Sequence, residues 1–312
     1  MKPIVIISGP TAAGKTALAL ALADRHQVDL INVDSAQVYR GMNIGTAKLE
    51  PEVLAAYPHA LIDIREPEET YSVADFVADA EVAITKAHQA GRWPVLVGGT
   101  PLYIRALLYG LDVLPSADPK TRQAIASRAE SVGWGALYEE LMAIDPGLKS
   151  RFQATDQQRI QRAFEIHQLT GKRPSELMTH NRLPRYASCR LVVTPHDRSV
   201  LHQRIASRFD EMLQMGFLDE VSSLMKRPNL SVDHASMKSV GYRQAWDYLA
   251  MGSNSLEAFR ASTIAATRQL AKRQLTALRK LSQTLWYDSL GVGLLDKATA
   301  SIVRFMDCQS PK

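Results

Sequence analysis

Residues 9–16 form a short segment whose residue types are suited to binding phosphate groups. They read Gly-Pro-Thr-Ala-Ala-Gly-Lys-Thr. Glycines let backbone N–H groups curl around phosphate oxygens, and the N-terminus of a following helix adds a favourable dipole. A lysine supplies positive charge, and a threonine hydroxyl is a ligand for Mg²⁺. We therefore predict that a diphosphate or triphosphate is bound, with Mg²⁺ at Thr16, by the loop residues Gly9, Pro10, Thr11, Ala12, Ala13, Gly14, Lys15 and Thr16.

A carboxylate follows the second apolar segment of the chain. Leu30 to Val33 has the pattern of a buried strand, and Asp34 closes it. Ligands of open parallel sheets bind at the carboxyl ends of the strands, so this carboxylate should lie beside the phosphate loop. There it would be able to accept a proton from an incoming nucleophile. The alternative is that Asp34 is a helix cap or a turn residue.

The third apolar segment ends without a carboxylate. Motor-type nucleoside triphosphatases usually place a Mg²⁺-binding Asp at the end of a further core strand. Here Pro94 to Val97 is followed by Gly98, Gly99 and Thr100, which makes that class of enzyme less favoured.

The segments that carry these residues predict an α/β fold. Apolar runs at 3–7, 30–33 and 94–97 alternate with helical patterns at 15–25 and 73–90. This alternation indicates a parallel sheet with helices on both faces, in a P-loop NTPase-like arrangement. Helical periodicity dominates from 114 to 190, and Leu191 to Thr194 then has the pattern of a strand. We predict a catalytic core of residues 1–113 and 191–312, and an inserted all-helical domain of residues 114–190.

Composition and cysteine content favour a cytoplasmic protein. Of the 312 residues, 46% are hydrophobic and 22% are charged, as in ordinary globular proteins. Cys189 and Cys308 offer neither a disulfide framework nor the spacing of a zinc site. The N-terminal apolar run from Ile4 to Ile7 is too short for a signal peptide or a membrane span. We expect a cytoplasmic monomer that has no membrane partner.

Positive charge gathers in the second part of the chain. The net charge is +5, and the segment from Arg260 to Tyr287 contains no acidic residue. On a helical wheel, Arg268, Lys272 and Arg279 share one face, with Arg273 and Lys280 beside it. A solvated helix usually includes Glu for pairing with such cations. The pattern favours contact with a nucleic-acid backbone, although a merely solvated face is the alternative.

The segment that begins at Asp34 carries a resemblance to a known family. It reads Asp-Ser-Ala-Gln-Val-Tyr-Arg-Gly-Met, and it is followed by Ile-Gly-Thr-Ala-Lys at 44–48 and Gly-Gly-Thr-Pro-Leu-Tyr at 98–103. Further matching segments are Gln158 to Ala163, Ser239 to Gln244 and Arg268 to Gln274. In this order, over nearly the whole chain, they resemble the tRNA dimethylallyltransferases. Ala13 stands where a serine is common in that family.

The resemblance implies a reaction and a set of site residues. A dimethylallyl group would pass from dimethylallyl diphosphate to N6 of the adenine directly 3′ of the tRNA anticodon, with Mg²⁺ as cofactor. Lys15, Thr16, Asp34 and Thr100 would be catalytic, with Asp34 as the acid/base group. An arginine would join the diphosphate site, Arg208 in preference to Arg204. The implied tRNA-binding residues, in the core and in the helical insertion that would contact the anticodon stem-loop, are Asp34, Ser35, Ala36, Gln37, Thr100, Arg122, Gln158, Arg159, Ile160, Gln161, Arg162, Ser239, Val240, Gly241, Tyr242, Arg243, Gln244, Lys272, Arg273, Gln274, Leu275, Thr276, Ala277, Leu278 and Arg279.

Two other functions fit parts of the sequence. A small-molecule kinase would hold ATP in the phosphate loop and use Asp34 to deprotonate a hydroxyl group. A nucleotide-regulated RNA-binding protein would use the basic segment with little catalysis. Phosphate transfer from ATP would identify the first, and tRNA affinity without a product would identify the second.

Overall fold

The computed structural model describes residues 2–178, 183–252 and 255–309. The chain forms two compact units, one of Met1–Leu108 with Pro184–Lys312 and one of Tyr109–Leu183. The helical unit therefore begins before the predicted residue 114 and ends before the predicted residue 190. Residues 187–190 are the first part of a strand. The sequence did not predict them as such because polar side chains among them interrupt the apolar pattern. Residues 179–182 of the predicted insertion lie outside the described residues.

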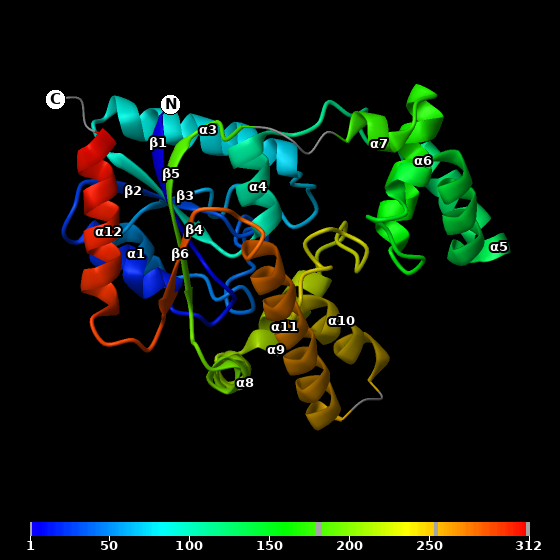
Figure 1. The fold of residues 1–312 in the computed structure, drawn as a ribbon. Helices are drawn as coiled ribbons and strands as arrows, with labels where there is room; N and C mark the ends of the chain where they lie inside the picture. The colour runs from blue at the N-terminus through cyan, green and yellow to red at the C-terminus, as the bar shows by residue number, and fades with distance from the viewer. Residues whose placement is uncertain (1, 179–182, 253–254, 310–312) are drawn as a thin grey trace. The chain divides into compact units, whose positions relative to one another are not determined.

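A six-stranded parallel sheet forms the centre of the first unit, which confirms the predicted fold class (Figure 1). Its order is β3-β2-β4-β1-β5-β6. Ser8 at the end of β1 lies opposite Gly98 of β4 and Val192 of β5, so the carboxyl ends of the central strands meet at one edge. The strands are β1 (Pro3–Ser8), β2 (Val28–Asn32), β3 (His59–Ala60), β4 (Trp93–Gly98), β5 (Ala187–Thr194) and β6 (Thr284–Asp288).

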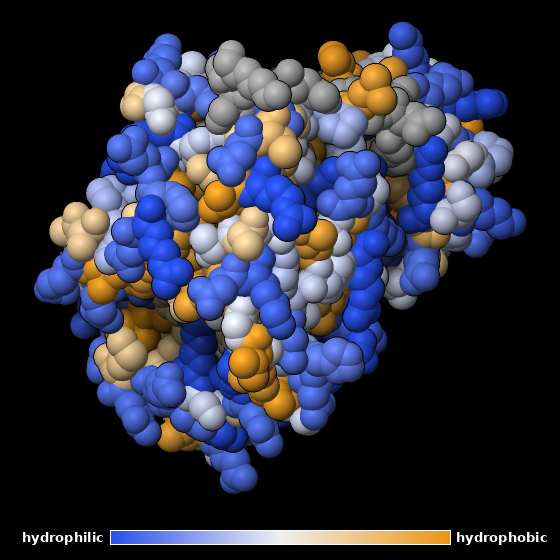
Figure 2. Space-filling model, turned by 60° about the vertical axis from the view of Figure 1, so that its left-hand side comes forward, coloured by the Kyte–Doolittle hydropathy of each residue, from blue (hydrophilic) through white to orange (hydrophobic). Residues whose placement is uncertain are grey.

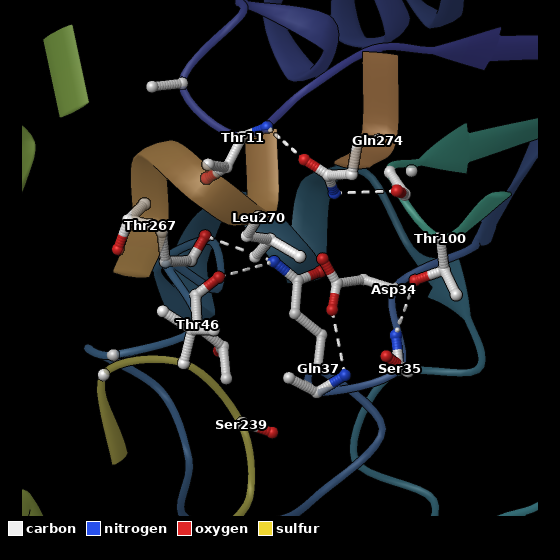
Figure 3. Close-up of a pocket in the computed structure, with 18 of the residues that line it drawn as sticks. Thr11, Asp34, Ser35, Gln37, Thr46, Thr100, Ser239, Thr267, Leu270 and Gln274 are labelled. Atoms are coloured by element: carbon white, nitrogen blue, oxygen red, sulfur yellow. Dashed lines mark hydrogen bonds between the residues drawn. The ribbon is translucent and has the colours of Figure 1, made fainter. Parts of the chain in front are cut away.

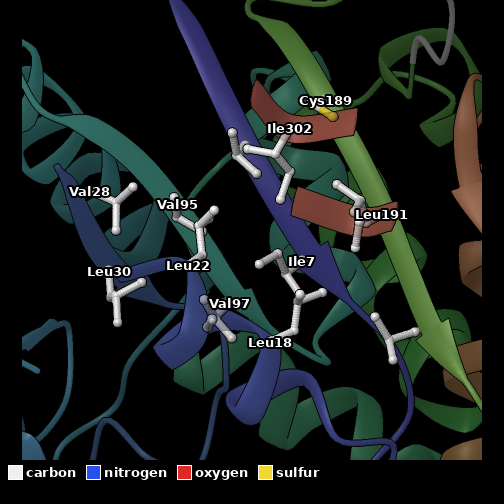
Figure 4. Close-up of a cluster of buried hydrophobic side chains, with 14 residues drawn as sticks. Ile7, Leu18, Leu22, Val28, Leu30, Val95, Val97, Cys189, Leu191 and Ile302 are labelled. Atoms are coloured by element: carbon white, nitrogen blue, oxygen red, sulfur yellow. The ribbon is translucent and has the colours of Figure 1, made fainter. Parts of the chain in front are cut away.

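Helices cover both faces of this sheet. On one face, α1 (Lys15–Ala23) and α12 (Leu294–Gln309) pack Leu18, Leu22 and Ile302 against alternate residues of the strands (Figure 4). On the other, α3 (Val73–Gln89) packs on β2 and β4, and Phe76 stacks on Tyr103 of α4 (Pro101–Tyr109). Because both faces are covered, the central strands are continuously apolar. A short helix, α2 (Pro51–Ala56), precedes β3.

Within the described residues, four helices lie between β5 and β6 in the chain. They are α8 (Arg198–Gln214), α9 (Phe217–Met225), α10 (Tyr242–Met251) and α11 (Leu256–Leu278). Edge-to-face contacts of Phe209 with Phe217 and Phe259, and of Phe217 with Tyr242, join all four of them. These contacts fix the helices that reach the carboxyl edge of the sheet.

The second unit is helical over its described residues. It contains α5 (Pro119–Ile144), the 3₁₀ helix η1 (Pro146–Leu148), α6 (Gln157–Thr170) and α7 (Pro174–Leu177). Ile125, Leu141, Leu148 and Phe164 belong to its own hydrophobic core. Gly133 interrupts α5 with φ +83° and ψ 152°, so the helix is kinked there.

No helix within the described residues is long and apolar enough to cross a membrane. On the face shown in Figure 2, hydrophilic side chains predominate and apolar ones occur in small groups.

Candidate active site

The phosphate loop leaves β1 and ends at the first turn of α1. Gly9 has φ +154°, and a Cβ atom there would lie 2.1 Å from the carbonyl oxygen of Val193, so the position requires glycine. Gly14 has φ +90° and precedes α1 directly. Ala12 also adopts a left-handed conformation, with φ +61°, which costs a non-glycine residue roughly 1 kcal/mol. Amides held in such turns form a concavity that binds anions.

One cavity at the carboxyl edge of the sheet is lined by the charged side chains of Lys15, Asp34 and Arg208, and also by those of Lys238 and Arg273. Nζ of Lys15 donates to the carbonyl oxygen of Pro10 at 2.7 Å. Burial lowers the pKa of Lys15 to about 8, with Asp34 opposing the shift and Arg208 adding to it. Burial likewise lowers the pKa of Arg208, again opposed by Asp34. The carboxylate is therefore electrostatically coupled to both cations.

The two candidate arginines of α8, Arg204 and Arg208, have different surroundings. Arg208 lies in the cavity, whereas Nη1 of Arg204 donates to Oγ of Ser289 at 3.1 Å. Sequence left this choice open because both residues lie on one helix. The structure brings Arg208 together with Lys15 and leaves Arg204 outside the cavity lining.

The segment after β2 is held in place by hydrogen bonds (Figure 3). Oδ1 of Asp34 accepts from the backbone N–H of Ala36 at 2.9 Å. Oγ1 of Thr100 accepts from the N–H of Ser35 at 3.2 Å. Nε2 of Gln37 donates to the carbonyl oxygen of Thr46 at 3.0 Å. Asp34 therefore makes the local bond of a turn residue and also lines the cavity, while its role as a proton acceptor stays a prediction.

The cavity has a volume of about 540 Å³ and is lined by both polar and apolar side chains. The loop residues and the segment 34–37 form the polar part. The apolar and aromatic side chains of the lining had been assigned no role from the sequence, and they include Tyr39, Leu49, Ile62, Tyr71, Tyr103, Ile205, Phe209, Met212, Phe217 and Leu270. Apolar side chains of this kind suit a short hydrocarbon group attached to the phosphates.

Glu220 organises a further part of the lining, and no motif had indicated it. Its two carboxylate oxygens accept from the backbone N–H groups of residues 43–45 at 2.7–3.2 Å. The hydroxyl of Tyr242 donates to Glu220 at 2.6 Å. Gly45 packs against Phe217 and Tyr242 with no room for a Cβ atom. These contacts join α9 and α10 to the loop that carries Thr46.

Two sides of α11 have different environments. Thr263, Thr267, Leu270 and Gln274 line the cavity, whereas Arg268, Lys272 and Arg279 are exposed. Arg273 is exposed and also belongs to the lining. Thr276 is exposed and Ala277 is half-buried. Leu275 and Leu278 are core residues, so their side chains do not meet the expectation of RNA contact.

Gln274 also departs from the predicted RNA contact, because the residue is only 8% exposed. Oε1 accepts from the N–H of Thr11 at 3.1 Å, and Nε2 donates to the carbonyl oxygen of Gly99 at 2.7 Å. It therefore joins α11 to the phosphate loop and to the end of β4.

The segment from Ser239 to Gln244 likewise contains both residues that line the cavity and residues that do not. Ser239, Val240 and Gly241 line the cavity. Tyr242 is fully buried, so its side chain is not available to RNA. Gln244 accepts from the N–H of Gly241 at the start of α10, and Arg243 pairs with Asp247.

The helical unit holds a cluster around a buried carboxylate. Glu165 has no exposed surface and accepts from Nε of Arg122 at 2.9 Å, from Arg162 and from the N–H of Asp118. Burial alone would raise the pKa of Glu165, but the hydrogen bonds from Arg122 and Arg162 hold it below its usual value. Gln161 donates to the carbonyl oxygen of Arg122. Of the other predicted residues, Gln158 and Arg159 are exposed, and Ile160 is a core residue rather than an RNA contact.

Oxygen atoms near the loop are suited to sharing a Mg²⁺ ion with a phosphate ligand. Among the described residues, no group of three or more His, Cys, Asp or Glu side chains is placed to hold a metal ion. Thr16 is exposed at the first turn of α1, and Asp34 lies in the same cavity. Mg²⁺ commonly binds through one or two protein oxygens, water and substrate phosphates. These residues fit an ion that is shared with a bound diphosphate.

The fold and the cavity define a phosphate-loop α/β protein with a carboxylate beside its anion site. Residues 37–281 match the protein-family model described as IPP transferase. A tRNA dimethylallyltransferase from Alkalilimnicola ehrlichii is 52% identical over 280 residues, which cover 89% of this chain and 88% of the relative. The chain belongs to the family of tRNA dimethylallyltransferases.

Solved structures of the same family share the fold. The full-length tRNA isopentenylpyrophosphate transferase from Bacillus halodurans superposes with a TM-score of 0.71 at 36% identity, covering 99% of this chain and 96% of that one. A eukaryotic dimethylallyltransferase, described as acting on tRNA, gives a TM-score of 0.80 at 25% identity, covering 100% of this chain and 81% of that one.

Proposed function

We propose that this chain transfers a dimethylallyl group from dimethylallyl diphosphate to N6 of the adenine directly 3′ of a tRNA anticodon. The observation that carries the proposal is the placement of Asp34 in one cavity with Lys15 and Arg208. The cations suit the diphosphate of the donor, and the carboxylate suits the incoming amine. The apolar side chains of the lining suit the hydrocarbon part of the donor.

The donor end of the reaction needs charge stabilisation. When the bond between carbon and oxygen breaks, the diphosphate carries the developing negative charge, which the loop amides, Lys15 and Arg208 stabilise. Mg²⁺ bound through Thr16 and the diphosphate would neutralise further charge on the leaving group. The allylic carbon spreads the positive charge that develops on it, so the chain's main task is to position the reacting atoms.

The acceptor end needs a base. The lone pair of adenine N6 is delocalised into the ring, which makes the amine a poor nucleophile. Asp34 would orient N6 and accept its proton as the new bond to carbon forms. Thr100 and Ser35 would keep the carboxylate in place through their hydrogen bond. The new bond joins N6 to carbon, and diphosphate leaves.

We further propose that tRNA is bound by cations of both compact units. The exposed Arg268 and Lys272 of α11, with Arg279 directly after its C-terminus, would contact the phosphate backbone. Arg122 and Arg159 of the helical unit would contact the anticodon stem-loop. The enzyme would act in the cytoplasm as a monomer, which sedimentation of the protein with and without tRNA would test.

One incubation tests the reaction. The chain is mixed with labelled dimethylallyl diphosphate, Mg²⁺ and unmodified tRNA, and the nucleosides are analysed by mass spectrometry. N6-(dimethylallyl)adenosine next to the anticodon is the expected product. A parallel incubation with γ-labelled ATP tests the kinase alternative, which the glycines at the end of β4 do not favour. Label transfer from ATP without a prenylated nucleoside would contradict the proposal.

A further inference from the structure

We propose that Gln274 is a positioning residue for the donor: it fixes the phosphate loop in the shape that receives the diphosphate. The inference rests on the proposed function and adds to the diphosphate site a residue that acts through the backbone of the phosphate loop. It also reassigns a position of the basic helix from RNA binding to the donor site.

The two hydrogen-bond partners of the Gln274 side-chain amide are compatible with only one orientation of that amide. The N–H of Thr11 needs an acceptor, which is Oε1 of Gln274 at 3.1 Å. The carbonyl oxygen of Gly99 needs a donor, which is Nε2 at 2.7 Å. A flipped amide would place like groups together in both contacts. A neutral amide is therefore the side chain that satisfies both partners at once.

Gly99 makes the room for this amide. A Cβ atom at Gly99 would lie 2.6 Å from Nε2 of Gln274 and 3.0 Å from the carbonyl oxygen of Gly9. The second glycine of the Gly-Gly-Thr segment is therefore explained by the approach of Gln274 from α11. Burial of the amide makes an unmade bond costly for both backbone partners.

The loop needs such an anchor because it is strained. Ala12 follows Thr11 directly and has φ +61°. Strained residues persist where the surrounding structure over-determines their conformation. The bond from Thr11 to Gln274 provides that constraint immediately before Ala12, and the amides beyond it stay free to converge on an anion. Loss of the bond should let the loop relax away from the phosphate-binding shape.

Calorimetric titration of the full chain with inorganic diphosphate and Mg²⁺, without tRNA, tests the proposal. Gln274→Leu removes both hydrogen bonds, and Gln269→Leu is the matched control, because Gln269 is exposed on the same helix. We expect Gln274→Leu to weaken diphosphate binding and to raise the KM for dimethylallyl diphosphate by about tenfold or more. The affinity for tRNA and the behaviour of the control should change less than about twofold.

Gln274→Glu supplies a readout that a purely structural role would not move. Its ionised carboxylate keeps an acceptor for Thr11 but faces the carbonyl oxygen of Gly99, whereas the protonated form donates to that oxygen. The affinity of this variant for diphosphate, divided by that of the wild type at each pH, should rise as pH falls from about 8 to about 6. This variant also decides the test if Gln274→Leu does not fold.

Two results would overturn the assignment. Folded Gln274 variants that bind diphosphate as the wild type does would remove Gln274 from the donor site. Variants that lose tRNA affinity and keep diphosphate affinity would make it an RNA contact. A wild-type chain that binds diphosphate but prenylates no tRNA would instead reject the proposed function, since the diphosphate titration does not depend on prenyl transfer.

Discussion

The backbone N–H of Ser35 donates to Oγ1 of Thr100 at 3.2 Å, and this bond ties the turn after β2 to the end of β4. The turn carries Asp34, so the threonine acts on the position of the carboxylate. The family resemblance had implied a catalytic role for Thr100, which closes the Gly-Gly-Thr segment. The hydrogen bond from Ser35 gives a physical reason for a threonine at this position.

Thr100→Val keeps the shape of the side chain and removes the acceptor. We expect kcat to fall about tenfold or more, because a displaced general base loses proton-transfer efficiency. Thr100→Ser retains the hydroxyl and is the matched control, with kcat close to that of the wild type. Equal rates for the valine and serine variants would show that the bond to Ser35 does not matter for catalysis.

Asp34→Asn tests the base itself. The amide oxygen can still accept from the N–H of Ala36, so the turn is preserved while the proton acceptor is lost. We expect kcat to fall by about 10² or more, with the affinities for tRNA and dimethylallyl diphosphate little changed. Single-turnover kinetics would separate the chemical step from binding. Near-normal turnover would reduce Asp34 to a turn residue.

The pKa of Lys15 should make diphosphate binding depend on pH. At about 8 it lies below the usual value of 10.5, so the free enzyme loses this positive charge as pH rises through 8. Affinity for diphosphate should therefore decrease from about pH 7 to about pH 9.5, as titration calorimetry would measure. Lys15→Arg keeps its charge over this range and should give a flatter profile. A flat wild-type profile would contradict the lowered pKa.

The same group affects the stability of the ligand-free protein in the opposite direction. Between about 8 and 10.5 the unfolded chain holds the proton of Lys15 more tightly than the folded chain does. The free energy of unfolding should therefore rise with pH over that range on account of this residue. Lys15→Met should remove this contribution to the pH dependence, which urea unfolding at several pH values would detect.

The exposed cations of α11 should determine the salt dependence of tRNA binding. Replacing Arg268, Lys272 or Arg279 by Gln should weaken every tRNA alike and reduce the salt slope by about one for each phosphate that the variant no longer neutralises. Arg304→Gln, at an exposed position of α12, is the control. Filter binding over a range of salt concentrations measures the slope. An unchanged slope in all three variants would remove this helix from the interface.

Glu165 should stabilise the helical unit through its arginines. Its pKa is held below the usual value, so the stabilisation is present above the pKa of an unfolded glutamate and is lost as pH falls through the lower folded value. We expect Glu165→Gln to reduce the free energy of unfolding by about 1–3 kcal/mol at neutral pH. Glu140→Gln, which breaks an exposed pair with Arg128, should cost less than about 1 kcal/mol. Equal losses of the free energy of unfolding in the two variants would show that burial does not make the Glu165 pairs more stabilising than an exposed pair.

The parts of the fold that sequence predicts are those with strong local patterns. The central strands are apolar on both faces, and the phosphate loop has a fixed spacing, so both were recognised. Strand β6 was missed because it is an edge strand with Leu285 and Trp286 exposed, which leaves no continuous apolar run or clear alternation. The two-residue β3 gives too short a signal.

The site was predictable where one segment carries several functional residues, as in the loop and at 34–37. Contacts between distant segments were not predictable. Glu220 and Gln274 act through partners more than 170 positions away along the chain. A family motif identifies a segment as a whole and does not separate its exposed residues from its buried ones, which is why Tyr242, Leu275 and Leu278 were included among the RNA contacts.

The central place of β1 has a consequence for biosynthesis. One of its partners, β4, ends at Gly98, whereas the other, β5, begins only at Ala187. The ribosome must therefore make the entire helical unit before the second edge of β1 is covered. The helical unit is contiguous and has its own core, so it can fold in that interval, while the strand that leads into the phosphate loop keeps an edge open to pairing with other chains. Conditions that slow translation between residues 99 and 186 should therefore increase aggregation of the nascent chain.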